Sequence, residues 1–332
     1  MDQQNQFTQS DDDFWSIALT SESPFNKQES DDENDENEAT KKSFSFAIPA
    51  PKANLTEEPL TILIRLNNGR GVLDDVSGIP WDASLILAGY LYGTHEGRSL
   101  CYNACSCTNS GGILELGSGL GLTGLAATAA AMKFGTHEER ILRIVLTDRN
   151  DHCILSHLKE NVDLNVSRYH SVNEHTLTNV SVEACDWMEV SIHLRTIAKE
   201  QQMDTKDTKY NFPQGQFHLI LGSALIYVPE HAIECADTIY YYLSDISSYS
   251  MEHTSYELKR QAIIVQLPDR SGFATHFLPR CQELGLNVVC EEVSEELIEI
   301  VESGLKKTIP SIRDYRMYFI TKQQCMRHRL CN

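Results

Sequence analysis

A glycine-rich turn is the strongest chemical signal in this sequence. Residues 113–124 read ILELGSGLGLTG, in which Gly119, Gly121 and Gly124 match the G-x-G-x-x-G pattern of turns that bind adenosine cofactors. Glycine has no Cβ and tolerates positive φ, so a ligand can approach the backbone of such a turn closely. The glycines alone do not choose between a dinucleotide and another ligand that contains adenosine.

Acidic residues around the turn favour a cationic ligand. A dinucleotide fold places its ribose-binding acid about 20 residues after the first glycine, where the glutamates at 138–139 lie in a polar loop. Asp148 instead ends the next apolar stretch, 29 residues after Gly119. The carboxylate of Glu115, two residues before Gly117, would repel a pyrophosphate but could accept hydrogen bonds from an ammonium group. S-adenosylmethionine carries a sulfonium and an amino group and no phosphate, so these residues predict a methyl donor.

Alternating strands and helices would carry this turn to one edge of a sheet. The expected strands are 112–116, 141–147, 176–184, 217–222, 262–267, 286–292 and 315–321, and the expected helices are 121–133, 150–164, 229–245 and 272–284. The segment SEELIEIVESG could form the helix between the last two strands. The pattern predicts an α/β fold with a mostly parallel seven-strand sheet, whose ligand binds at the carboxyl ends of the strands.

Three segments lie outside this alternation. PLTILIRL at 59–66, followed by NNGRG and VLDD, predicts an N-terminal β-hairpin. A helix is expected to begin after Pro80, in the segment SGIPWDASLILAGYLYG. The polar segment 192–215 has a weak helical start, and we interpret it as a surface insertion before the fourth strand.

The net charge of -19 is concentrated at the N-terminus. Residues 1–40 hold twelve Asp or Glu and a single basic residue, Lys27, and too little apolar surface to order themselves. We therefore expect a disordered acidic tail over 1–43 and one domain over 44–332. Within the tail, DDDFWSIAL is either solvated or a short peptide that docks on a partner. The acidity disfavours nucleic acid as a partner, because nonspecific affinity for phosphates comes mainly from Lys and Arg.

The sequence carries no sign of secretion. No stretch approaches the roughly 18 apolar residues of a membrane-spanning helix, and the N-terminus does not resemble a signal peptide. We expect a cytoplasmic or nuclear protein with no membrane partner, in which the ten cysteines are reduced. No second ligand pair at zinc-site spacing accompanies Cys101, Cys105 and Cys107, so we expect an exposed loop there and no metal. We expect the same for the cysteines and histidine at 325–331.

Several motifs together resemble one enzyme family. The turn and the T-D pair at 147–148 resemble the first motifs of the seven-strand, Rossmann-like class I S-adenosylmethionine-dependent methyltransferases. IPWDASLILAGYL resembles the tryptophan-containing helix of the family-16 protein lysine methyltransferases. LKENVDLN at 158–165 looks like their L-x-x-N-x-x-x-N helix, and C-D-W at 185–187 looks like their D-W pair after the third strand. In order and spacing, the resemblance covers roughly residues 59–322.

The resemblance implies a role for each matching residue in the turn and the second strand. Glu115, Gly117 and Gly119 would border the methionine part of S-adenosylmethionine, and Gly121 would allow close packing. Asp148 would accept hydrogen bonds from the ribose hydroxyls.

Three further residues would complete the cofactor site. Asp186 and Trp187 would lie at the adenine, near its exocyclic amine and along its ring face, and Trp81 would cover the cofactor. Taken alone, each residue also fits a structural role, because Asp148 and Asp186 could cap helices and the tryptophans could belong to the core.

The match breaks after the fourth strand. The family carries D/E-x-x-Y there, and this chain has Tyr227 with Ala224 in place of the acid. Methyl transfer to lysine requires a neutral amine in line with the methyl group, and an alanine cannot orient it. Ser223 or Glu230 could substitute, although Glu230 also fits the first turn of a helix, and we expect Tyr227 and Ser223 to line the catalytic site.

Three interpretations of Ala224 follow. We rank first a protein lysine methyltransferase whose orienting group comes from elsewhere, acting as a monomer on another protein and needing no metal. Methylation of a histidine ring or a protein N-terminus comes second, and a noncatalytic, cofactor-binding interaction module comes third. An NAD-dependent oxidoreductase is a more distant alternative.

Overall fold

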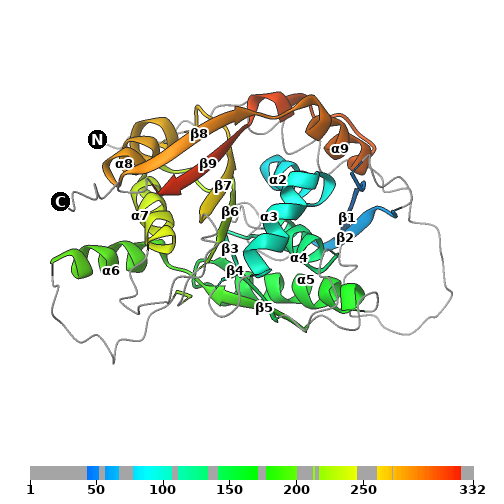
Figure 1. Cartoon of the computed structure of the whole chain (residues 1–332), viewed down its shortest axis with the longest axis horizontal. Helices are drawn as coiled ribbons and strands as arrows, with labels where there is room; N and C mark the ends of the chain where they lie inside the picture. The colour runs from blue at the N-terminus through cyan, green and yellow to red at the C-terminus, as the bar shows by residue number, and fades with distance from the viewer. Residues whose placement is uncertain are drawn as a thin grey trace, which may run out of the picture. The chain divides into compact units, whose positions relative to one another are not determined.

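The computed structural model of the protein describes residues 43–51, 57–66, 78–106, 111–133, 141–170, 177–199, 212–213, 217–244, 260–270 and 272–322. Seven strands form one sheet in the order β5-β4-β3-β6-β7-β9-β8 (Figure 1). They are β3 (Ile113–Leu116), β4 (Ile141–Asp148), β5 (Leu177–Ala184), β6 (Leu219–Ser223), β7 (Gln261–Gln266), β8 (Leu286–Glu292) and β9 (Arg316–Lys322). The expected strands are confirmed to within two residues at each end.

The sheet is parallel except at β9, which runs antiparallel to both β7 and β8. Its order reverses at β3, because β4 and β5 extend from one side of this strand while β6 and β7 extend from the other. Open α/β sheets bind their ligands at such a reversal, outside the carboxyl ends of the strands. The predicted fold class is confirmed by this topology.

Helices cover both faces of the sheet (Figure 1). One face carries α2 (Asp82–Gly93), α3 (His95–Ser106), α4 (Leu122–Lys133), α5 (His152–His170) and α9 (Glu295–Leu305), and the other carries α6 (Trp187–Lys199), α7 (Ala232–Leu243) and α8 (Leu278–Glu283). The helix in SEELIEIVESG, expected between the last two strands, is confirmed as α9.

Two apolar cores fill the space between the sheet and these helices. In β7, for example, Ile263 and Val265 belong to the core under α2 and α4, while Ala262 and Ile264 belong to the core under α6 and α7. Side chains of a strand alternate between its two faces, so a strand buried on both sides reads as a continuous apolar run. This is why the sequence reveals the central strands clearly.

The predicted N-terminal hairpin is confirmed as a two-strand antiparallel sheet, but the partner of β2 differs from the expected one. β2 (Leu60–Arg65) pairs antiparallel with the preceding strand β1 (Ser43–Ile48). Residues 67–77, where the expected partner strand lies, are outside the described part of the chain. Because β1 begins at Ser43, that residue belongs to the domain; residues 1–42 of the predicted tail are not among those described.

Two buried asparagines of α5 hold the other edge of β2. Asn165 Oδ1 accepts from Leu63 N at 2.9 Å, and its Nδ2 donates to Leu63 O at 2.7 Å. Asn161 Oδ1 accepts from Arg65 N at 2.8 Å, and its Nδ2 donates to Leu120 O of the glycine-rich turn at 3.2 Å. The side-chain amides thus take the place of a third strand, and Asn161 also ties β2 to the turn.

Two other expectations are corrected by helices. The first part of the expected insertion at 192–215 belongs to α6, which leads the chain from β5 back along the sheet. Cys101 and Cys105 are buried on α3 and not in an exposed loop, because they face the apolar core; Cys107 and residues 325–331 lie outside the described residues. Within the described ranges no three His, Cys, Asp or Glu side chains gather as metal ligands, and no helix is long and apolar enough to cross a membrane.

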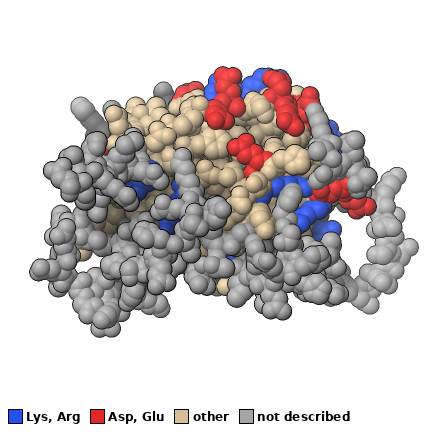
Figure 2. Space-filling view, viewed as in Figure 1, with Lys and Arg blue, Asp and Glu red and all other residues tan. Residues whose placement is uncertain are grey.

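Acidic side chains gather where β8 meets α9, along the upper edge of the molecule in Figure 2. Glu291 and Glu292 end β8, and Glu295 and Glu296 begin α9; all four are exposed. β8 is an edge strand of the sheet, and charged residues on an edge discourage pairing with other chains.

Candidate functional site

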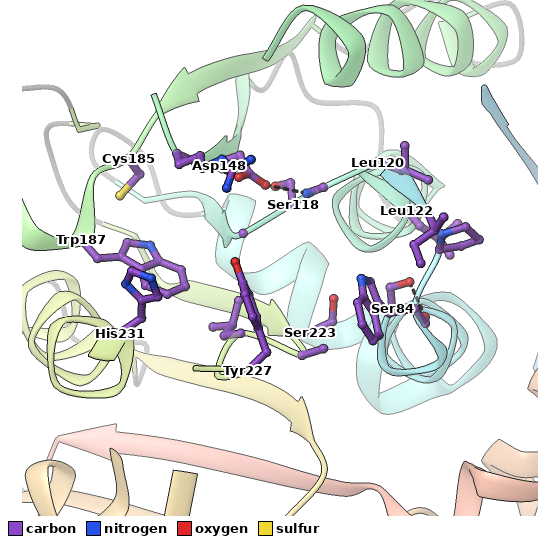
Figure 3. Close-up of a pocket in the computed structure, with 18 of the residues that line it drawn as sticks. Ser84, Ser118, Leu120, Leu122, Asp148, Cys185, Trp187, Ser223, Tyr227 and His231 are labelled. Atoms are coloured by element: carbon purple, nitrogen blue, oxygen red, sulfur yellow. Dashed lines mark hydrogen bonds between the residues drawn. The ribbon is translucent and has the colours of Figure 1, made fainter. Parts of the chain in front are cut away.

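A cavity of about 390 Å³ lies at the carboxyl ends of β3, β4 and β6 (Figure 3). This volume falls in the usual range for a small-molecule or cofactor site. Eight of the nine predicted site residues line it, and the exception is Glu115: the eight are Trp81, Gly117, Gly119, Asp148, Asp186, Trp187, Ser223 and Tyr227.

The cavity has two ends with Tyr227 between them (Figure 3). We call the part around Asp148, Trp187 and the neighbouring Asp186 the Trp187 end, and the part around Ser223 and Ser84 the Ser223 end. His231 lies beside Trp187 at the first end, and the glycine-rich turn spans the opposite wall.

The turn adopts a backbone that requires glycine. Gly117, Gly119 and Gly121 have φ of 57°, 52° and 85°, a region that L side chains rarely occupy. A Cβ at Gly117 would also lie 2.9 Å from Leu225 Cδ2. Gly117 therefore packs closely against the loop after β6, and Ser118 and Leu120 of the turn line the cavity beside it.

Hydrogen bonds fix the turn to β4. Ser118 N donates to Thr147 O at 2.8 Å, and Thr147 N donates to Ser118 Oγ at 3.1 Å. Asp148 Oδ2 accepts from Gly119 N at 2.8 Å. The acid at the end of β4 thus both faces the cavity and holds the turn in place.

Glu115 lies behind the turn, and its buried side chain does not line the cavity. Its Oε2 accepts from Gly124 N at 3.1 Å, in the first turn of α4. Burial raises the pKa of Glu115 to about 8, although hydrogen bonds with Ser118 and Gly124 oppose the rise. Near neutral pH this carboxyl group is largely protonated, so the repulsion of a pyrophosphate that its sequence position suggests does not arise.

Asp186 caps a helix beside the cavity. Its Oδ1 accepts from Met188 N at 2.9 Å and from Glu189 N at 3.3 Å at the start of α6. The capping role and a ligand-binding role are compatible, because a carboxylate accepts several hydrogen bonds and Asp186 also lines the cavity. The cap places Trp187 at the first position of α6, half-buried at the cavity wall.

Trp81 is the residue before α2 and lines the cavity; it is hydrogen-bonded to Ser84, which lies at the Ser223 end. Its backbone oxygen accepts from Ser84 Oγ at 2.7 Å, which fixes the start of the helix. The guanidinium of Arg270 lies 5.9 Å from its ring centroid, within the range of a cation–π contact.

The loop after β6 is held by β7. Ala224 has φ of 51° and donates its N–H to Val265 O at 2.9 Å. The buried Gln266 donates through Nε2 to Ile226 O at 2.9 Å and accepts from Ile226 N at 3.3 Å. These bonds fix Ile226, the residue before Tyr227. The Tyr227 side chain is 42% exposed and projects into the cavity (Figure 3).

The structure separates the two candidates for the missing acid. Ser223 lines the cavity, whereas Glu230 is exposed and does not. Two residues that the motifs do not contain, His231 and Glu234, also line it. His231 ends the short helix η3 (Pro229–His231) and Glu234 lies three residues later in the first turn of α7, and this helical spacing is the sequence signal that could have revealed them.

Known proteins resemble this chain at two levels. A family model described as lysine methyltransferase matches residues 62–251. Among solved structures, the chain is similar to a precorrin-6y C5,15-methyltransferase from Geobacter metallireducens, with 14% identity over 70% of this chain and 90% of that one, at a TM-score of 0.32. It is also similar to a TehB-like SAM-dependent methyltransferase from Corynebacterium glutamicum, with 13% identity over 68% and 88%, at a TM-score of 0.34.

A third similar structure is the Phospholethanolamine N-methyltransferase 2 of Haemonchus contortus, in complex with phosphomonomethylethanolamine and S-adenosylhomocysteine. The identity is 10% over 86% of this chain and 71% of that one, at a TM-score of 0.33. Likenesses this distant do not bear on what this chain methylates.

Proposed function

Because the chain belongs to the lysine methyltransferase family, whose methyl donor is S-adenosylmethionine, we propose that it methylates a lysine side chain of another protein. The observation that carries this proposal is the cavity at the carboxyl ends of β3, β4 and β6. It brings the glycine turn, Asp148, Asp186 and Trp187 together with Tyr227.

The residues of the cavity fit S-adenosylmethionine. Its lining residues include three acids, Asp148, Asp186 and Glu234, and one arginine, Arg149. An acidic lining suits a ligand with a sulfonium and an ammonium group and disfavours a pyrophosphate. The bare backbone at Gly117 leaves room for a thioether chain beside it. These features also argue against the oxidoreductase alternative.

Each residue at the Trp187 end has a part in holding the donor. The carboxylate of Asp148 already accepts one N–H on each oxygen, from Gly119 and from Arg149, and a carboxylate has further lone pairs for ribose hydroxyls. Trp187 offers a flat ring for the adenine, and Asp186 offers its second oxygen for an N–H donor. When bound, S-adenosylmethionine supplies a methyl group on a positively charged sulfur.

Residues at the Ser223 end would receive and orient the amine. The hydroxyl groups of Tyr227 and Ser223 can accept N–H bonds from a neutral amine and direct its lone pair toward the methyl carbon, about 3 Å away. Free lysine is an ammonium near neutral pH, and desolvation between apolar side chains lowers the pKa of an amine. Trp81 and Leu225 provide such surroundings.

Ala224 changes the balance at this end. A carboxylate there would stabilise the ammonium form and raise the pKa of the incoming amine. Alanine removes that stabilisation, so the neutral, nucleophilic form is favoured while orientation depends on Ser223 and Tyr227. The same substitution also suits the second candidate, a histidine acceptor, because a histidine ring is largely neutral near pH 7 and needs no carboxylate to offset a charge. For the third candidate, a noncatalytic cofactor-binding module, the loss of the orienting acid is itself the supporting observation.

The test is incubation of the purified protein with tritiated S-adenosylmethionine and a lysate of its own cells. Labelled proteins are acid-hydrolysed and the labelled amino acids separated, with the Gly119→Arg variant as control. We expect label in methyl-lysine that disappears in the variant. Label in methyl-histidine or a terminal residue would replace lysine with another acceptor, and no label from a folded, cofactor-binding protein would favour the noncatalytic module.

A further inference from the structure

Glu234 is a carboxylate in the cavity that no motif of the family match contains. It lies in the first turn of α7, lines the cavity, and has one buried carboxylate oxygen, Oε2, with no hydrogen-bond partner among the described residues. Buried polar atoms in native proteins almost always have a partner. A ligand that fills the cavity with an N–H donor would supply one.

The position of Glu234 within the cavity follows from its neighbours on α6 and α7. Asp237, which is fully buried and one turn later on α7, accepts from Ser191 Oγ of α6 at 2.6 Å. Both helices follow parallel strands on the same face of the sheet and begin at the cavity. Glu234 lies one turn before Asp237, in the first turn of α7, and it lines the same cavity as Trp187 and Met188 at the start of α6.

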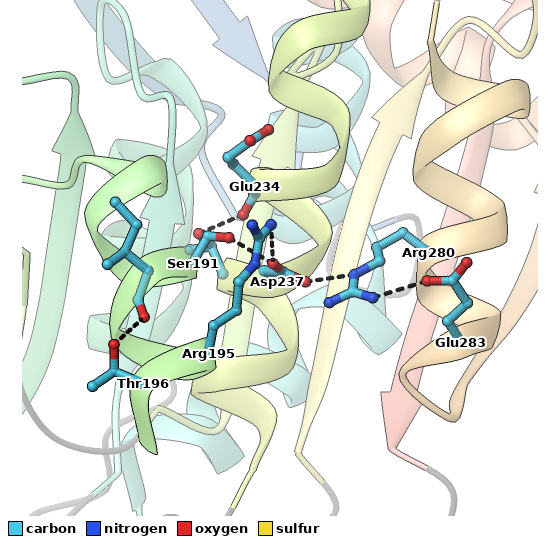
Figure 4. A network of polar contacts seen from close by, with 9 residues as sticks. Ser191, Arg195, Thr196, Glu234, Asp237, Arg280 and Glu283 are labelled. Carbon is cyan, nitrogen blue, oxygen red and sulfur yellow. Dashed lines mark hydrogen bonds and ion pairs between the residues drawn. The ribbon is translucent and has the colours of Figure 1, made fainter. Parts of the chain in front are cut away.

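Figure 4 shows that the carboxylate of Glu234 points away from the network around Asp237. In that network Arg280 Nε donates to Asp237 Oδ1 at 2.7 Å and Arg195 donates to its Oδ2 at 3.3 Å. A structural reason for an acid at 234 exists, because a negative side chain is favourable in the first turn of a helix. That reason does not account for a buried Oε2 that has no hydrogen-bond partner among the described residues, on a carboxylate that points away from Arg195 and Arg280.

The chemistry at the Trp187 end requires an acceptor. If the adenine lies along Trp187, as the proposed function has it, its exocyclic amine brings two N–H donors to this end. Asp186 already uses Oδ1 to cap α6. We propose, on the basis of the proposed function, that Glu234 accepts a hydrogen bond from the 6-amino group of the adenine and thereby selects a 6-amino purine over a 6-oxo purine.

The test compares binding of S-adenosylhomocysteine and S-inosylhomocysteine by titration calorimetry. Inosine carries a carbonyl oxygen in place of the amino group, so the Glu234 carboxylate would repel it. The wild type should prefer the adenosine ligand by about 10- to 100-fold, the range of one hydrogen bond to a charged group. Glu234→Gln should reduce this preference to a few-fold, because an amide can either donate or accept.

Glu230→Gln is the matched control, since Glu230 lies four residues earlier, is exposed and does not line the cavity. Its preference should equal that of the wild type. Equal weakening of both ligands in Glu234→Gln would mean that Glu234 only supports the fold and would overturn the assignment. The assignment would also be overturned if Glu234→Gln bound both ligands as the wild type does but had a raised KM for the protein acceptor. A wild type that binds neither ligand would overturn the proposed function as well.

Discussion

The two ends of the cavity are built by different means. At the Trp187 end, positive-φ glycines, the hydrogen bond from Gly119 to Asp148 and the Asp186 cap of α6 are all local to strand ends. At the Ser223 end, the loop that carries Tyr227 is held by the side chain of Gln266, 40 residues away on β7. The family motif is intact at the first end and lacks its acid at the second.

This difference matches the tasks of the two ends under the proposed function. All members of such a family use the same donor, so the backbone that binds it can keep one fixed conformation. Acceptors vary, and a loop held by a few side chains can change its residues without disturbing the sheet. The comparison predicts that substitutions at the Trp187 end impair donor binding, while those at the Ser223 end impair transfer alone.

Gly117→Val should have the largest effect, because a Cβ there lies 2.9 Å from Leu225 Cδ2 and φ is 57°. We expect no measurable binding of S-adenosylhomocysteine by calorimetry. Gly285→Val is the matched control, since Gly285 also has positive φ, at 69°, but a Cβ there would meet nothing within 4 Å. Both variants should lose about 1–2 kcal/mol of stability from backbone strain, and equal donor binding by the two would contradict the prediction.

Tyr227→Ala should lower kcat for methyl transfer by about 100-fold, the scale on which misplacement of a reacting group acts. Binding of S-adenosylhomocysteine should change less than the rate does, since Tyr227 projects from the loop of the Ser223 end. Steady-state kinetics and calorimetry on the same preparation separate the two quantities. If Tyr227→Ala instead lost donor affinity and kept its kcat, the assignment of donor binding to the Trp187 end and of transfer to the Ser223 end would be contradicted.

Gln266→Leu should act more weakly, lowering kcat by about 10-fold, because it releases the loop at Ile226 without removing Tyr227. Donor affinity should stay close to that of the wild type. Gln266→Glu keeps one acceptor for Ile226 N and should recover part of the rate. If neither variant changes the rate, the Gln266 side chain does not position Tyr227.

Glu115→Gln should affect activity least, within about 2-fold, because the side chain is isosteric and does not line the cavity. It should instead change how stability depends on pH. The pKa of Glu115 is raised from 4.5 to about 8 in the folded state. Between these two pH values the folded wild type keeps the proton on Glu115, while the unfolded chain loses it.

The wild type therefore loses stability as pH rises from about 4.5 to about 8, relative to the variant, and the difference is constant above that. Urea unfolding at several pH values measures it, without cofactor present. A difference that does not vary with pH would show that Glu115 is ionised in the fold.

Prediction from sequence succeeded where local chemistry restricts the residue type. The turn at Gly117–Gly121 requires positive φ, and the central strands are buried on both faces. Positive φ selects glycine, and burial on both faces selects a continuous apolar run, so a single sequence shows both features. Eight predicted site residues consequently line one cavity, although which of them touch a ligand stays a prediction.

Prediction failed where pairing depends on distant segments. The residues 60–65 alone do not indicate that their partner is 43–48. The turn residues NNGRG directly after them favour pairing with a later strand, and this local signal led to the wrong partner. The contacts of Asn161 and Asn165 with β2 span about a hundred residues of sequence. At 192 the sequence showed only a weak helical start, although the chain forms α6 from Trp187 to Lys199.

The most direct test of the account is a crystal structure of the protein with S-adenosylhomocysteine. We predict the adenine at Trp187 with its amino group toward Asp186 and Glu234, the ribose at Asp148, and the sulfur beside Gly117 facing Tyr227. An adenine found at the Ser223 end, or a ligand bound outside this cavity, would contradict the assignment of the two ends.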